Sequence, residues 1–489
     1  MHISMGKLFL WASGGYLVGS LLVGFAPSQV MMLLLVALAG AIAWAVTLSW
    51  RSGLLLGLAV ISSGLGFWVA FERVETWRTL PVTIAFHGEV VVVKRENPKT
   101  FYQPITLRSL GESSLSSYIL WRAPRTVEII PGEHMMLECA LKRPENFDPR
   151  FDYVQYLATK NIGYLCDKTI SSTALPGRTE WRTQLFTLQS KLRSEIQARL
   201  PDPAAGLLEG LFLGGDDALP TSVVENFRRA GLSHIIAVSG YNMTLVAFAM
   251  LFLALLSGLW RKTATFLAVI GIIGFLLLID TSAASIRAAL MAWMVCLAYF
   301  LGRPASSWNG LFLAALLMTI FNPLLVRYDV GFQLSFLATL ALITASPWLE
   351  PLVRKKSLFR KVLVLLLVTS IINIFIFPVL AYHFGTMSLL SPLSNLLVLP
   401  LIPITMGLGF AMLLISFFIP FVSIIFAFPV WLLLMLIVWV GEYFGRWSWS
   451  VLEGLTPSVW FIVLWYIVLA IALWYSRRLQ YRYALRMDH

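Results

Sequence analysis

Long apolar stretches recur along this chain, and they constrain its fold more than any other feature. A helix of about 20 apolar residues crosses the ~30 Å hydrocarbon core of a bilayer. The chain is 58% hydrophobic and only 13% charged, whereas soluble domains are about 25% charged. The sequence therefore predicts a polytopic α-helical membrane protein with about twelve spans, at 8–25, 30–47, 53–71, 241–259, 263–280, 284–301, 307–321, 331–347, 362–381, 400–418, 421–442 and 458–476.

Lysine and arginine gather in alternate short loops. The densest run includes Arg354, Lys356 and Lys361, and a basic tail follows the last span at 477–489. Because cytoplasmic loops are enriched in Lys and Arg, the pattern predicts a multi-pass protein of the cell inner (cytoplasmic) membrane with both termini in the cytoplasm. The one large polar segment, 72–202, then lies outside the cytoplasm.

That outer segment contains short strand-like runs at 88–96, 104–110, 117–122 and 126–142, separated by turn residues. Strands of this length over about a hundred residues favour a small extracytoplasmic β-barrel of the oligonucleotide/oligosaccharide-binding (OB) type over 72–175. A small β-sandwich is nearly as compatible with the same pattern.

Two of the three cysteines, Cys139 and Cys166, lie in this outer domain. An oxidising compartment permits a disulfide between them, and the alternative is a pair of buried thiols. The third, Cys296, lies within a span, where it is expected to pack as a small apolar residue.

Residues 176–202 carry apolar side chains every three or four positions, with basic residues between them. This spacing predicts a basic amphipathic helix. Such a helix either lies on the outer membrane surface and joins the barrel to the spans, or packs on the barrel itself.

Several polar groups fall inside the spans of the second half, 203–476. Arg287 follows Asp280 by seven residues across a short turn, so the two either form an ion pair or Arg287 lines a polar path. Gln333 and Ser335 lie two residues apart near the end of a span, where hydrogen bonds between helices explain them equally well.

Two segments, 207–220 and 388–403, are apolar but interrupted by glycine or proline. Broken segments at membrane depth persist where protein shelters them or where they line a wet cavity, and paired ones indicate a transport site. We expect re-entrant segments here, and the alternative is a pair of interfacial loops.

A serine and a histidine, Ser239 and His234, lie between these segments and invite comparison with a hydrolase. A nucleophile elbow requires glycine two residues before the serine, and Ala237 stands there instead. The histidines and cysteines lack metal-ligand spacing, and no nucleotide-binding G-x-x-x-x-G-K-[ST] motif occurs. The sequence therefore predicts no enzyme, no metal site and no cofactor.

The segment F-R-R-A-G-L-S-H-I-I-A-V-S-G (227–240) resembles the signature of the ComEC family, the inner-membrane channels that import single-stranded DNA during natural transformation. Further similar motifs follow in the family's order over nearly the whole chain: R-P-E-N-F-D-P-R-F-D-Y (143–153), L-L-E-G-L-F-L-G-G-D-D-A-L (207–219), S-I-R-A-A-L-M (285–291), G-F-Q-L-S-F-L-A (331–338) and S-P-L-S-N-L-L-V-L-P (391–400). The resemblance implies a DNA channel, with another polyanion or a lipid-linked saccharide as the alternative cargo.

The chain departs from this family in two ways. Tyr241 and Asn242 stand where relatives usually have Leu-His, and an asparagine cannot titrate as an imidazole does. The metallo-β-lactamase-like domain that many relatives carry at the C-terminus is not found, since no H-x-H-x-D-H cluster occurs. The resemblance then implies a separate nuclease, besides a DNA receptor and a translocating ATPase as partners.

The division into domains follows from these features: N-terminal spans at 1–71, the outer barrel at 72–175, the amphipathic helix at 176–202, the channel domain at 203–476 and the basic tail. The candidates that would contact single-stranded DNA fall into two sets. The path through the membrane is assigned to Arg228, Arg229, His234, Ser239, Asn242, Arg287, Gln333 and Asn395, and the outer-domain site to Lys94, Arg95, Phe101, Tyr102 and Arg122.

Overall fold

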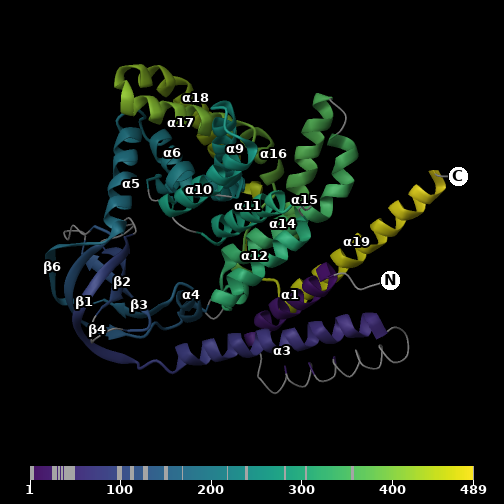
Figure 1. The fold of residues 1–489 in the computed structure, drawn as a ribbon, viewed down its shortest axis with the longest axis horizontal. Coiled ribbons are helices and arrows are strands. Elements are labelled where there is room, and N and C mark those ends of the chain that lie inside the picture. Colours follow the sequence, from purple (N-terminus) through teal and green to yellow (C-terminus); the bar gives the residue numbers. More distant parts are fainter. Residues whose placement is uncertain are drawn as a thin grey trace.

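The computed structural model describes residues 5–24, 30, 34, 37, 50–95, 102–110, 115–124, 130–147, 152–167, 169–216, 218–236, 240–279, 282–302, 306–353 and 357–487. Strands gather at one end of the molecule, and helices form the rest (Figure 1). The helices are α1 (Met5–Leu21), α3 (Trp50–Arg78), α4 (Tyr153–Thr159), α5 (Trp181–Gln197), α6 (Ala204–Leu213), α7 (Thr221–Ala230), α8 (Ser233–Ile236), α9 (Gly240–Leu256), α10 (Arg261–Leu278), α11 (Ala283–Phe300), α12 (Ser307–Phe321), α13 (Leu325–Tyr328), α14 (Val330–Val353), α15 (Leu358–Phe384), α16 (Ser391–Val398), α17 (Leu401–Phe418), α18 (Pro420–Gly445) and α19 (Val459–Met487), with 3₁₀ turns η1 (Leu22–Gly24) and η3 (Ser448–Ser450).

The described part of the chain has seven helical segments that are long and apolar enough to span a membrane, rather than the twelve predicted. They are the later part of α3, the helices α10, α11, α14 and α15, the pair α16 and α17 taken together, and α18. Among the side chains that the structure describes, the apolar parts of α9, α12 and α19 comprise 10–17 residues, and α1 has 17. The predicted span 30–47 lies almost wholly outside the described residues. The prediction of a multi-pass helical membrane protein is confirmed in this coarser form.

The strands are β1 (Thr83–Arg95), β2 (Tyr102–Ser109), β3 (Tyr118–Pro124), β4 (Glu133–Lys142), β5 (Ile162–Cys166) and β6 (Thr169–Thr179). Their order is β1-β2-β3-β5-β4-β6, and β1 also pairs with β4. The first five strands therefore close into a small barrel, as predicted, while β6 continues along β4. Only β3 and β5 pair in parallel.

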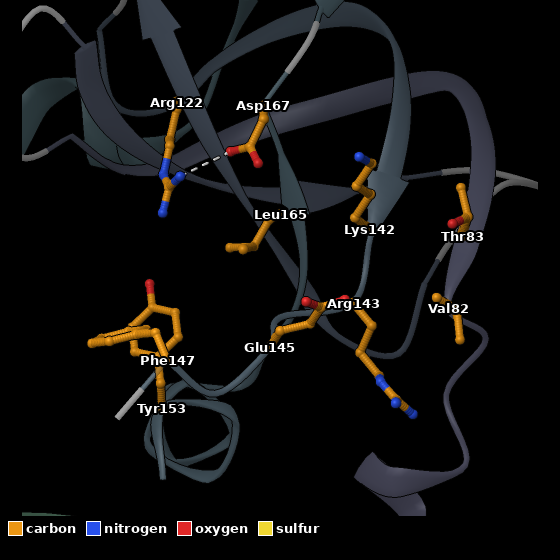
Figure 2. Close-up of a pocket in the computed structure, with 10 residues that line it drawn as sticks. All are labelled: Val82, Thr83, Arg122, Lys142, Arg143, Glu145, Phe147, Tyr153, Leu165 and Asp167. Carbon is orange, nitrogen blue, oxygen red and sulfur yellow. Dashed lines mark ion pairs between the residues drawn. The ribbon is translucent and has the colours of Figure 1, made fainter. Parts of the chain in front are cut away.

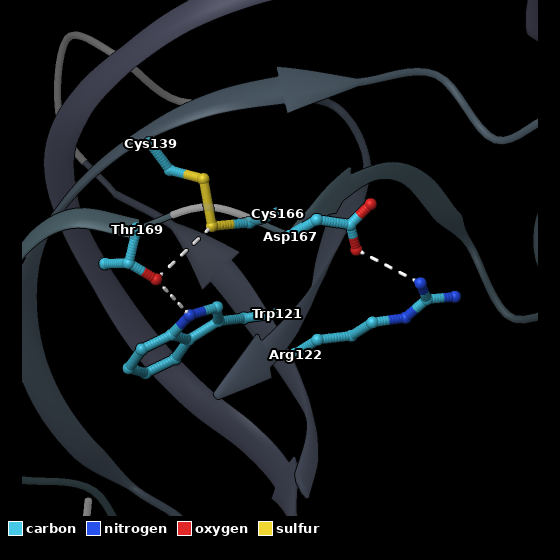
Figure 3. The surroundings of a disulfide bond; sticks show 6 residues. All are labelled: Trp121, Arg122, Cys139, Cys166, Asp167 and Thr169. Atoms are coloured by element: carbon cyan, nitrogen blue, oxygen red, sulfur yellow. Dashed lines mark hydrogen bonds and ion pairs between the residues drawn. A yellow bond between two sulfur atoms is a disulfide. The ribbon is translucent and has the colours of Figure 1, made fainter. Parts of the chain in front are cut away.

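The barrel closes around large apolar side chains, which alternate with more exposed ones along β3 and β4. Trp121 lies in the centre, fully buried, and its indole Nε1 donates a hydrogen bond of 2.6 Å to Thr169 Oγ1. A disulfide joins Cys139 of β4 to Cys166 of β5 beside this tryptophan (Figure 3). The bond links two neighbouring strands at the point where the barrel closes.

Replacing both Cys139 and Cys166 by alanine is expected to destabilise the barrel by about 3 kcal/mol, because the disulfide constrains a loop between cysteines 27 positions apart. The measurement is the resistance of the barrel to protease in the purified full chain over a urea series. A Cys296→Ala variant is the control, since Cys296 is not in the disulfide. Equal protease resistance in all three proteins would contradict the expectation.

The helix α5 leads from the barrel to the predicted channel domain, 203–476 (Figure 1). Near its start, Arg108 of the barrel forms a 2.6 Å ion pair with Glu180. Near its end, Ile196 is buried among channel residues, and Gln197 Nε2 donates to Glu209 Oε1 of α6 at 2.8 Å. The predicted amphipathic helix therefore contacts both the barrel and the channel, with Trp181 exposed on its outer side.

The largest apolar core lies in the channel domain and is formed by α6, α7, α8, α16, α17 and α18. Close helix contacts depend on small residues: a Cβ on Gly441 of α18 would lie 2.5 Å from the ring of Phe227 on α7. A short two-stranded pairing of β7 (Met387–Ser388) with β8 (Val451–Leu452) lies next to this core. These elements bury the apolar residues Phe227, Ala230, Leu232, Ile235 and Ile236 of the signature segment.

Candidate functional site

The signature segment begins with a tight turn between α7 and α8. Gly231 ends α7 in the left-handed conformation, at φ 74°, and Leu232 N donates to Phe227 O at 2.8 Å. A Cβ at Gly231 would lie 2.5 Å from Ser391 Cβ of α16. On the same turn, Ser394 Oγ donates to Ala230 O at 2.6 Å. The turn is therefore locked against the start of α16, and only glycine satisfies both the conformation and the space.

The second predicted broken segment, 388–403, is less interrupted than expected. The helices α16 and α17 are separated by two residues, and together they form one 28-residue candidate span. Pro392 lies in the first turn of α16, and Pro400 precedes α17. A proline at a helix start removes an N–H that has no partner within the helix, so these prolines do not break the segment. The re-entrant course of this segment through the membrane stays a prediction.

The two arginines of the signature are already engaged within the protein. Arg228 binds both carboxylate oxygens of Glu225, at 2.8 and 2.7 Å, and this contact lowers the pKa of Glu225. Arg229 Nε donates to Gly445 O at 2.9 Å, and its Nη1 lies 3.4 Å from Glu453. Arg229 thus holds α7 to the end of α18. Arg228 is the more exposed of the two.

The remaining polar candidates near the signature differ in their burial and in their hydrogen-bond partners. Asn242 is 2% exposed, and its Nδ2 donates to Leu211 O at 3.2 Å, so it joins α9 to α6. Asn395 is also buried: its Nδ2 donates to Ser391 Oγ at 3.0 Å, while its Oδ1 has no hydrogen-bond partner in the described part of the chain. His234 has an exposed side chain. Ser239 and the side chain of Tyr241 lie outside the described residues.

Arg287 lies in the second turn of α11, within a candidate span. Its Nε donates to Ser335 Oγ of α14 at 2.8 Å, its Nη1 to Met291 Sδ at 3.6 Å, and its guanidinium lies 5.8 Å from the ring centroid of Phe336. No carboxylate of a described residue pairs with it, and Asp280, the predicted partner, lies outside the described part. A charge inside a span is costly and is characteristic of a functional position, and the described neighbours of Arg287 are all neutral.

The start of α9 approaches this guanidinium closely. A Cβ on Gly240 would lie 3.1 Å from Arg287 Nη2, so glycine leaves the guanidinium room at this point. Gly240 is the last residue of the signature, and the path candidates Asn242 and Arg287 are therefore held by neighbouring elements, α9 and α11. Gln333, by contrast, donates to Val326 O and Arg327 O at 2.9 and 2.8 Å, where it caps α13.

The outer domain has a cleft of about 630 Å³ where β3, β4 and β5 meet the loop before α4. Figure 2 shows the rings of Phe147 and Tyr153 on one side, across from an ion pair between Arg122 and Asp167. The two ring centroids are 5.1 Å apart, Phe147 is 75% exposed, and the ion pair measures 3.3 Å. The other residues that line the cleft are Val82, Thr83, Lys142, Arg143, Glu145 and Leu165.

Of the five predicted outer-domain residues, Arg122 lines this cleft, and Lys94 is half-buried on β1. Phe101 and the side chains of Arg95 and Tyr102 lie outside the described residues. Sequence reasoning missed Lys142, Phe147 and Tyr153. The sequence signal that pointed to Phe147 and Tyr153 was the family-like motif at 143–153. Its aromatic residues directly follow a strand-like run and show no apolar periodicity of their own.

Local hydrogen bonds shape the aromatic side of the cleft. Asn146 Oδ1 accepts from Val154 N at 3.0 Å, and Asp152 Oδ1 accepts from Gln155 N at 3.0 Å. Both side chains cap the start of α4, which places Tyr153 beside Phe147. Within the described residues, no group of three His, Cys, Asp or Glu side chains is arranged to hold a metal ion.

Comparison with known proteins adds to this geometry. The competence protein family matches residues 211–479, which is more than half of the chain. The ComE operon protein 3 of Bacillus subtilis (strain 168) is 25% identical over 277 residues, which make up 56% of this chain and 34% of that protein. The chain thus spans about a third of the length of this relative. No solved structure matches the chain. The family match covers the signature turn and the span that carries Arg287, and the chain belongs to the competence protein (ComEC) family.

Proposed function

We propose that this protein is a channel that conducts single-stranded DNA across the cytoplasmic membrane during natural transformation. The observation that carries the proposal is Arg287, a guanidinium inside a candidate span whose contacts among the described residues are a hydroxyl, a thioether and a ring. A phosphate would provide a negative charge that no described residue supplies, and a strand provides phosphates one after another. Conduction requires sites that are favourable to enter and easy to leave, which suits one arginine held by neutral neighbours.

The outer barrel supplies the receiving site in this proposal. Its strand order places β4 beside β1, which is a Greek-key arrangement, and a five-stranded barrel of this kind is typical of OB domains. Bases stack on aromatic rings, and phosphates bind basic side chains. Phe147 and Tyr153 offer the rings, and Lys142 is an exposed cation that forms no ion pair with a described residue. A strand bound here lies on the domain that α5 joins to the channel.

The proposal also includes the orientation of the protein in the membrane and its partner proteins. The distribution of basic loops supports cytoplasmic termini and an outward-facing barrel. The family implies a DNA receptor that delivers the strand, a translocating ATPase and a nuclease for the second strand. We propose that this chain performs no hydrolysis itself, because the segment around Ser239 lacks the elbow glycine.

Replacing Phe147 by alanine is expected to weaken the binding of a labelled oligothymidine by about tenfold, because base stacking on one ring contributes ~1–3 kcal/mol. The measurement is fluorescence anisotropy on the purified full chain in detergent. Ile170→Ala is the matched control, since Ile170 is equally exposed on β6 at 69% and does not line the cleft. The affinity of the wild type should fall with salt, with a log–log slope of about −1.4 to −2 for two or three phosphate contacts.

Two outcomes of this experiment would count against the proposal. Oligonucleotide binding that ignores salt would rule out phosphate contacts in the cleft. Tight binding of a neutral saccharide, combined with no binding of the oligonucleotide, would favour a transporter of lipid-linked saccharides, for which Glu145 and Asp167 could accept hydroxyl hydrogen bonds.

A further inference from the structure

The short helix α4 belongs to the cleft at its first residue. Tyr153 begins α4 and lines the cleft, with its ring against Phe147. Asn146 Nδ2 donates to Asp152 Oδ1 at 3.2 Å, and both side chains accept from backbone N–H groups of α4. The aromatic side of the cleft and the start of α4 therefore move as one hydrogen-bonded unit.

The other end of α4 contacts the channel domain. Thr159 O accepts a hydrogen bond of 2.7 Å from Asn322 Nδ2, which ends α12. Ala158 packs in a small apolar cluster with Val74 and Trp77 of α3 and with Leu324 beside α13. A helix of seven residues is only about 10 Å long, so a displacement of Tyr153 is carried to Asn322 with little loss.

From Asn322 the contacts continue to the polar centre of the channel. Asn322 Oδ1 accepts from Leu324 N at 3.2 Å, just before α13. Gln333 at the start of α14 holds the carbonyl groups at the end of α13. Two residues later in α14, Ser335 accepts the 2.8 Å hydrogen bond from Arg287. An unbroken series of hydrogen bonds and helices thus joins the cleft to the guanidinium.

We propose that α4 couples occupancy of the barrel cleft to the α13–α14 end of the channel, with Asn322 as the positioning residue. The proposal rests on the proposed function, because the cleft must bind an oligonucleotide for coupling to matter. Such coupling is reciprocal. If a ligand in the cleft changes the conformation of α13 through α4, then fixing the conformation of α13 changes the affinity of the cleft for that ligand. The partner site is Arg287, so a strand in the cleft prepares the channel to accept its next phosphate.

Hydrogen–deuterium exchange on the full chain in detergent tests this, with and without oligothymidine. In the wild type, the oligonucleotide should slow exchange in two separate segments, 153–159 and 322–333, by at least about threefold. Asn322→Asp keeps the acceptor for Leu324 N and removes the donor to Thr159 O. In this variant the protection of 153–159 should remain while that of 322–333 is lost. DNA uptake should fall at least tenfold, with the oligonucleotide affinity within twofold of the wild type.

The control is Asn309→Asp, the same substitution at the opposite end of α12, which should behave like the wild type. If the oligonucleotide protects 153–159 but not 322–333 in the wild type, the result contradicts the coupling and still supports oligonucleotide binding in the cleft. If the oligonucleotide does not bind and protects neither segment, the proposed function fails and the coupling fails with it. Normal uptake and full protection in Asn322→Asp would remove Asn322 from its role. The wild-type result needs no substitution, so it decides the coupling even where a variant does not accumulate.

Discussion

Replacing Arg287 by glutamine is expected to reduce DNA uptake by about 100-fold or more while leaving the amount of protein in the membrane unchanged. A hydrogen bond to a charged group contributes ~1.5–3 kcal/mol, and 1.4 kcal/mol corresponds to a factor of ten. Losing two such bonds to a passing phosphate accounts for the effect. Glutamine still reaches Ser335 and removes a charge that is costly inside a span, so the fold should not suffer. Transformation frequency and immunoblots of membrane fractions provide the measurement.

Two further variants, one at Arg287 and one at Arg228, test the role given to the charge of Arg287. Arg287→Lys keeps a positive charge but presents it as a point, without the fork that binds two phosphate oxygens, and should retain intermediate uptake. Arg228→Gln should have a much smaller effect than Arg287→Gln, because Arg228 already binds both oxygens of Glu225. Equal losses in both glutamine variants would contradict the special place given to Arg287.

Replacing Gly231 by alanine is expected to destabilise the channel domain by about 3 kcal/mol. The left-handed conformation costs a residue with a Cβ ~1–2 kcal/mol, and forcing an extra methyl group into a packed core costs ~1–3 kcal/mol. The new Cβ would lie 2.5 Å from Ser391 Cβ, an atom that no side-chain rotation can move away. The helix α16 must therefore shift, and the hydrogen bond from Ser394 to Ala230 lengthens. The apparent midpoint of thermal unfolding in detergent should fall by several degrees, and uptake should fall with it.

Gly258→Ala provides the matched control for Gly231→Ala. Gly258 has nearly the same backbone conformation, at φ 77°, but an added Cβ there meets nothing within 4 Å. It reports the conformational cost alone, so the difference between the two variants measures the packing of the turn against α16. A Gly231→Ala protein no less stable than Gly258→Ala would show that α7 and α16 are not locked together.

Four strands of the barrel could be predicted because each carries its own signal, whereas β5, which is buried along its whole length, and β6 were not predicted. Ile105, Leu107, Ile119 and Trp121 alternate with exposed residues along β2 and β3, and this period of two is visible without tertiary contacts. The count of spans was less predictable. Apolar content alone does not fix the length of a helix, and the span predicted at 307–321 corresponds to α12, which has 15 residues.

The candidate site was only partly predictable, because most of it depends on distant partners. Arg287 stood out in the sequence, since a charge in a span is conspicuous on its own. The engagement of Arg229 with Gly445 and Glu453 joins residues more than 200 positions apart, and no local pattern indicates it. The cleft was missed for the same reason: Phe147 and Tyr153 line a cleft only when the barrel brings β3 and β5 beside their loop.

The guanidinium of Arg287 has a second consequence, which concerns the membrane potential. A pore wide enough for a DNA strand would also admit sodium ions and protons when no strand fills it. Fixed positive charge in a narrow, poorly hydrated passage raises the barrier for cations, and little salt is present there to screen it. In the proposed path, the same side chain that attracts phosphate therefore helps to keep the idle channel electrically tight, so that the cell does not lose its ion gradients between rounds of DNA import.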